Sequence, residues 1–139
     1  MINKLTTEQI EELASEIVDF LIKYRLWVDV VICFNNSVYM TEDIYNDRKY
    51  LVRKNNVKPN EYVKNHNPEH ILSINYDSRL YEVLHYGVYE IDDDVIKTFH
   101  ECDEFVRNLQ QEFYNIFEKY GLEYYDCGNG EITCYYIEK

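Results

Sequence analysis

The sequence has few residues that interrupt regular structure, with two prolines and four glycines among 139 residues. It also contains a single alanine. No apolar run approaches the roughly 20 residues that cross a bilayer, and the first residues lack the apolar segment of a signal peptide. No two cysteines have CxxC spacing. We therefore expect a cytoplasmic protein, outside membranes, whose thiols are reduced and buried as small apolar groups. The cysteines are Cys33, Cys102, Cys127 and Cys134.

Basic residues are also few, and the formal net charge is −12. Hydrophobic residues make up 46% and charged residues 29% of the chain, which is typical of a folded globular protein. The length suits a single domain, 1–139. A surface this acidic repels nucleic acid and anionic membranes and attracts basic partners. Solubility alone is an alternative reason for the charge.

The first half of the chain predicts a helix followed by strands. Apolar residues recur at helical spacing over 7–25, and Thr6 with Gln9 fits a capping box. The segment 27–34 is rich in Val, Ile and aromatic residues, and it predicts a strand that turns into a second one at 37–41. A further strand is expected at 71–76.

The second half predicts a short helix that starts at Asp77 and ends at Gly87, and then a long helix over 93–120 that Asp92 opens. We allow a break in it near residue 102. The last segment, 122–137, predicts a hairpin with an Asn-Gly turn at residues 129 and 130. Together these elements predict an α+β fold: an antiparallel sheet of about five strands, two longer helices on one face and a C-terminal β-hairpin.

The sequence lacks the common catalytic and nucleotide-binding motifs. The chain contains no G-x-S-x-G, no P-loop and no G-x-G-x-x-G motif. Pro68 lies between His66 and His70, which argues against their sharing one helix face. His100 and Cys102 have no second ligand pair at zinc-site spacing. The run of three aspartates from residue 92 suits a helix start better than a cation site. We therefore predict no catalytic residue, no metal and no cofactor.

The carboxylates gather in two segments. Those on the first predicted helix recur about every 6 Å, four residues at 1.5 Å each, and 90–104 contains seven acidic residues. Two such helices side by side would imitate the charge of a nucleic-acid backbone, and a solvated helix face is the alternative. The candidate partner-binding residues are Glu8, Glu12, Glu16, Asp19, Asp93, Asp94, Glu101, Asp103 and Glu104. A basic segment, 48–64, departs from this pattern with a local charge of +5.

Tyrosine is abundant, with fifteen residues. One core of this size does not satisfy so many hydroxyl groups, so several tyrosines should lie at the surface, where this residue favours protein interfaces. The pairs Tyr124-Tyr125 and Tyr135-Tyr136 should place one ring on each face of the C-terminal hairpin. This Tyr-rich surface also suits a homodimer. Codon bias of an AT-rich genome is an alternative source of the tyrosines.

In size, charge, composition and helix-borne acidity the chain resembles the small acidic anti-CRISPR and antirestriction proteins of phages and mobile elements. The resemblance implies an inhibitor whose acidic helices dock into the basic nucleic-acid groove of a host defence nuclease, without binding nucleic acid itself. The first alternative is a non-catalytic accessory interaction module of a mobile element that uses 48–64. A small enzyme of unknown reaction is the second.

Overall fold

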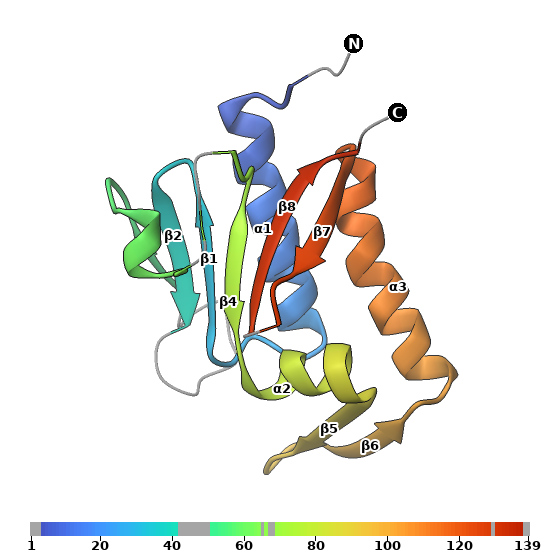
Figure 1. The fold of residues 1–139 in the computed structure, drawn as a ribbon. Helices are drawn as coiled ribbons and strands as arrows, with labels where there is room; N and C mark the ends of the chain where they lie inside the picture. Colours follow the sequence, from blue (N-terminus) through green and yellow to red (C-terminus); the bar gives the residue numbers. More distant parts are fainter. Residues whose placement is uncertain (1–3, 42–50, 65, 67–68, 129, 138–139) are drawn as a thin grey trace.

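The computed structural model describes residues 4–41, 51–64, 66, 69–128 and 130–137. These residues form one six-stranded antiparallel sheet and a separate two-stranded sheet (Figure 1). The order in the large sheet is β3-β2-β1-β4-β8-β7, so that β3 and β7 are its edges. Its strands are β1 (Val30–Phe34), β2 (Ser37–Thr41), β3 (Leu51–Lys54), β4 (Ser73–Tyr76), β7 (Leu122–Asp126) and β8 (Glu131–Tyr136).

Two long helices, α1 (Thr7–Lys23) and α3 (Glu104–Lys119), lie side by side on one face of the large sheet. α1 begins as predicted: the Thr6 hydroxyl accepts from the Gln9 amide, and the Gln9 side chain accepts from the Thr6 amide. The apolar stripes of both helices pack against the inner residues of β1, β4 and β8, and Phe20 and Phe113 meet where the helices touch. The α+β class, the two helices on one face and the C-terminal hairpin are confirmed.

The predicted helix over 93–120 is wrong in its first part. The two-stranded sheet occupies this region, with β5 (Val88–Asp92) pairing with β6 (Lys97–Glu101). The Asp93 carboxylate accepts from the amides of Val95 and Ile96, which closes a hairpin turn instead of capping a helix. α3 begins only after Asp103, whose carboxylate accepts from the Val106 amide.

Two further details differ from the sequence-based prediction. The large sheet has six strands among the described residues, because β3 adds to β2. The C-terminal hairpin does not turn through two residues. The Cys127 amide bonds the Glu131 carbonyl, so residues 128–130 form the connection. Asn129 lies outside the described residues.

The short helix before Gly87 is confirmed. It comprises α2 (Ser78–Tyr81) and a π-helical turn, Glu82–Tyr86, and Gly87 ends it in the left-handed conformation with φ +66°. In the described part of the chain, no helix is long and apolar enough to cross a membrane. All four cysteines are free thiols, but the predicted burial is wrong for Cys102 and only partial for Cys127. Burial raises the pKa of Cys33 and of Cys134 to about 12, whereas Cys102 is exposed.

Candidate functional site

The acidic stripe on α1 is partly neutralised by lysines. Glu8 and Glu12 are exposed, but Glu16 Oε1 lies 2.6 Å from Lys119 Nζ at the end of α3. Lys23 Nζ lies 4.0 Å from Glu112 Oε1 across the same helix pair. Exposed pairs of this kind contribute little to stability, yet they cancel charge locally. The two helices therefore imitate a nucleic-acid backbone less well than the sequence predicts.

Two further candidate carboxylates, Asp93 and Asp103, are held by hydrogen bonds within the hairpin and at the start of α3. Arg25 Nη2 donates to Asp93 Oδ2 at 2.6 Å, and the amides of Ile96 and Val95, followed by Arg25, lower the pKa of Asp93 to about 2. Asp103 caps α3 and lies 2.7 Å from His100 Nδ1, and its pKa is also lowered, chiefly by the Val106 amide. Asp94, Glu101 and Glu104 are exposed around them.

Three acidic residues of 90–104, Glu90, Asp92 and Glu101, lie around the exposed ring of Phe99. Phe99 points outward from β6, directly opposite Glu90 on β5. Asp92, opposite Lys97, and Glu101 share the same outward face, because side chains two apart lie on one side of a strand. The opposite face is packed against the protein, with Ile91 fully buried. We call the set Glu90, Asp92, Phe99 and Glu101 the hairpin patch.

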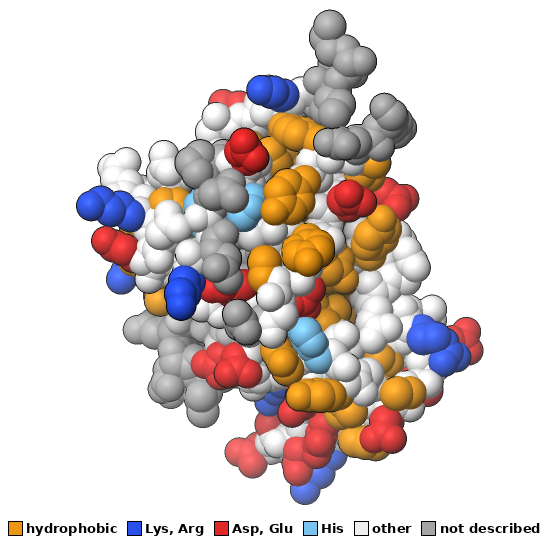
Figure 2. Space-filling view, viewed as in Figure 1, with side chains coloured by type: hydrophobic (Ala, Val, Ile, Leu, Met, Phe, Trp, Pro, Cys, Tyr) orange, Lys and Arg blue, Asp and Glu red, His pale blue; other side chains and the backbone are white. Residues whose placement is uncertain are grey.

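The segment 86–99 has exposed apolar side chains. Val95 is 80% exposed at the hairpin tip, Phe99 is 58% exposed, and Tyr86 at the end of the π-helical turn is 64% exposed. Figure 2 shows hydrophobic and acidic side chains mixed at this end of the molecule. Apolar side chains that gather inside a polar rim are typical of protein-binding surfaces.

Two polar contacts and one set of aromatic contacts hold the hairpin to the body of the protein. The Tyr89 hydroxyl donates to the Tyr24 carbonyl at 2.9 Å, and the Arg25–Asp93 ion pair joins the loop after α1 to the hairpin turn. The ring of Phe105 in α3 packs on Tyr89 and stacks on His100. A surface fixed in this way loses little conformational entropy when it binds.

The basic segment 48–64 is only partly described, since Arg48 and Lys49 lie outside the described residues. Arg53, on β3, donates to Glu11 Oε1 at 2.6 Å and to the Tyr39 hydroxyl, and it lies over the Phe34 ring. The positive charge of Arg53 therefore faces α1, where Glu11 lies.

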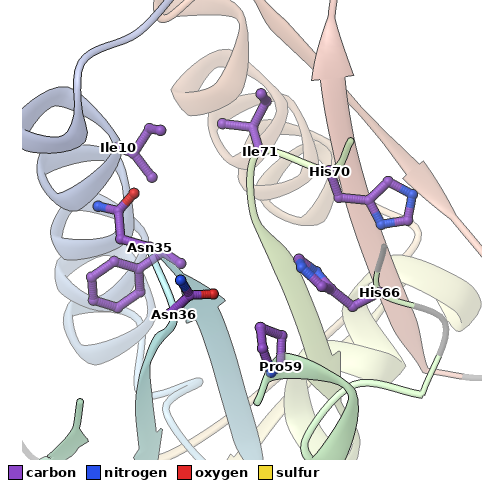
Figure 3. Close-up of a pocket in the computed structure, with 8 residues that line it drawn as sticks. Ile10, Asn35, Asn36, Pro59, His66, His70 and Ile71 are labelled. Carbon is purple, nitrogen blue, oxygen red and sulfur yellow. The ribbon is translucent and has the colours of Figure 1, made fainter. Parts of the chain in front are cut away.

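A second polar cluster lies on the sheet face opposite the helices. His66 Nδ1 is 2.7 Å from Ser73 Oγ, and His70 Nε2 is 2.9 Å from the Tyr135 hydroxyl. The two imidazoles border a pocket of about 310 Å³ between the β1–β2 turn and the segment before β4 (Figure 3). Ser73 is fully buried, so its hydroxyl orients the imidazole and is not accessible to a substrate. Among the described residues, no group of three or more His, Cys, Asp or Glu is placed to hold a metal ion.

These histidines predict a loss of stability in mild acid. Burial lowers the pKa of both, with the neighbouring His70 adding to the effect on His66 and Glu69 opposing it on His70. A histidine with a lowered folded-state pKa contributes stability above its unfolded pKa of about 6.5 that is lost as the pH falls. We expect the urea midpoint to fall between pH 7 and pH 5. The double variant H66N/H70Q should flatten this dependence, and an equal fall in variant and wild type would contradict it.

The sequence does not predict the hairpin patch, because Val95 and Phe99 fall within the predicted helix over 93–120. Alternation was the available signal, because outward and inward residues alternate in 88–92 and 97–101. No protein-family model, curated protein or solved structure matches the chain.

Proposed function

We propose that the protein is an inhibitory binding protein whose hairpin patch and adjoining α3 start dock into the basic nucleic-acid groove of a nuclease. The observation that carries the proposal is the exposed Phe99 ring beside Glu90, Asp92 and Glu101, of which Asp92 is paired with Lys97 at 3.8 Å. As the resemblance to anti-defence proteins implies, the nuclease would belong to a host defence system and the inhibitor to a phage or mobile element.

The two components of the surface have different roles. An aromatic ring that becomes buried at the centre of an interface supplies most of the affinity. Carboxylates around it attract a basic groove over long range and speed association. Glu101 belongs to this rim, and the exposed residues Asp94, Glu104, Glu8 and Glu12 add to the long-range field.

A comparison of two charge reversals tests the proposal. The first variant is E90K/D92K/E101K at the hairpin patch, and the control is E8K/E12K/D19K on α1. Both variants change the net charge by the same amount. An effect of net charge alone would therefore weaken binding equally in the two variants. The tagged wild type captures partners from host lysate, which are identified by mass spectrometry and purified.

We expect a nucleic-acid-binding nuclease whose affinity the hairpin variant reduces at least tenfold more than the control does. Binding should weaken as salt is raised, because many partly exposed charges are involved. Equal losses in the two variants, or a partner without a nucleic-acid site, would contradict the proposal.

A further inference from the structure

We infer that the outward face of the β5–β6 sheet binds an arginine side chain of the partner, whose guanidinium group lies on the Phe99 ring and is held by the Glu90 carboxylate. This site deepens the proposed function, on which it rests, by naming the group of the basic groove that meets the hairpin patch. Four steps support it: the pairing of ring and carboxylate, their exposure, the charge around them, and the same arrangement elsewhere in the protein.

Phe99 and Glu90 form a close pair across the two strands. The Cys102 amide donates to the Gly87 carbonyl at 2.8 Å, so this pair at the base of the hairpin is hydrogen-bonded. Hydrogen-bonded and non-hydrogen-bonded pairs alternate along an antiparallel sheet, and Glu90–Phe99 is the third pair beyond that one. It is therefore a non-hydrogen-bonded pair, in which the Cβ atoms lie about 5 Å apart. A single bound group can contact both side chains.

The face that carries this pair is exposed and negatively charged. Phe99 is 58% exposed, and Glu90 is exposed beside it. The hairpin patch has three carboxylates, and the one lysine on this face, Lys97, lies 3.8 Å from Asp92 toward the hairpin tip. These four residues line most of an open cavity of about 300 Å³. The charge favours a cation as the occupant and repels the phosphates of a nucleic acid.

A ring beside a carboxylate favours guanidinium over ammonium. The guanidinium group is planar and weakly hydrated, so it stacks on an aromatic face and at the same time donates two parallel hydrogen bonds to a carboxylate. The lysine ammonium is compact and strongly hydrated, and it lacks this planar fork. The partner residue at Phe99 is therefore an arginine.

The protein itself contains one example of this arrangement. The guanidinium carbon of Arg53 lies 5.4 Å from the centre of the Phe34 ring, and Arg53 Nη2 donates to Glu11 Oε1 at 2.6 Å. Ring and carboxylate thus bind one guanidinium group together. The Phe99–Glu90 pair presents the same two groups on the outward face of the hairpin.

Two peptides of equal charge, acetylated tetra-arginine amide and tetra-lysine amide, test this preference by NMR titration of the isotope-labelled protein. We expect tetra-arginine to bind about threefold or more tightly and to shift the Phe99 ring resonances, because the ring adds a cation–π contact. Oligothymidylate is the third probe, for stacking of bases on the ring. It should leave these resonances unchanged.

Variants of the pair separate its two contributions. F99Y keeps the aromatic face and should retain the preference for tetra-arginine, whereas F99L keeps only apolar area. F99L and E90Q should each at least halve the ratio of the two dissociation constants. E118Q is the control for E90Q, because it removes the same charge at an exposed position in the last turn of α3. Circular dichroism checks that every variant is folded.

Equal affinities for the two peptides would overturn the arginine site. So would a preference that F99L and E90Q leave unchanged, or oligothymidylate bound at Phe99. The proposed function fails separately. A protein that prefers tetra-arginine but does not displace nucleic acid from its partner would contradict the nuclease inhibitor alone, and displacement without the preference would contradict only the arginine site.

Discussion

Replacing Gly130 by alanine is expected to lower the free energy of unfolding by about 3 kcal/mol, from left-handed backbone strain and overpacking together. Gly130 has φ +73°, and a Cβ atom there would lie 2.5 Å from the Tyr76 carbonyl oxygen. The contact cannot relax easily, because the Gly130 carbonyl accepts from the Tyr76 amide at 2.7 Å and so fixes the two backbones together. The loss is a large fraction of the stability of a typical domain.

Gly121 provides the matched control for this substitution. Its φ is +76°, but nothing lies within 4 Å of the Cβ position. G121A therefore carries only the left-handed strain, about 1 kcal/mol. Urea unfolding of both variants measures the difference. Equal losses would mean that the Gly130 loop does not approach β4 as the structure has it.

Replacing Phe99 by alanine is expected to weaken partner binding about 30-fold, the effect of removing an aromatic hot-spot residue worth about 2 kcal/mol. The loss should appear in the dissociation rate, because the charges that steer association are retained. F99L should recover part of the affinity, since leucine keeps most of the apolar area. Surface plasmon resonance with the purified partner measures all three.

The F99A result depends on the fold being unchanged. Phe99 is mostly exposed, so its removal should change the free energy of unfolding by no more than about 1 kcal/mol. Unchanged affinity in folded F99A would exclude this ring as the anchor of the interface.

The C-terminal hairpin and the capping box of α1 could be predicted because each depends on neighbours in sequence. Thr6 and Gln9 are three residues apart, and Gly130 lies next to the strand that it introduces. The start of α3 could not be predicted, because Asp92, where the sequence predicts the helix to open, and Asp103 are equally good helix caps in the sequence. Asp93 is bound instead by Arg25, 68 residues away, and this long-range pair supports the hairpin form of 88–101.

The candidate site was predicted only in part for the same reason. Of its carboxylates only Glu101 is among the candidate residues predicted from the sequence, Glu90 and Asp92 are counted only among the seven acidic residues of 90–104, and the ring that they surround is not predicted. Phe99 has an apolar character that suits a core, and only the pairing of β5 with β6 turns it outward. The pair His70–Tyr135, 65 residues apart, likewise arises when β4 and β8 become neighbours, which no local pattern specifies.

Competition with nucleic acid for the partner tests the central claim most directly. The partner nuclease is loaded with a fluorescently labelled oligonucleotide, and anisotropy is followed as wild-type protein or E90K/D92K/E101K is added. We expect the wild type to displace the oligonucleotide completely and in proportion to its occupancy of the nuclease, and the triple variant to fail at the same concentrations. A stable ternary complex, with the oligonucleotide still bound while the protein saturates the nuclease, would contradict the account.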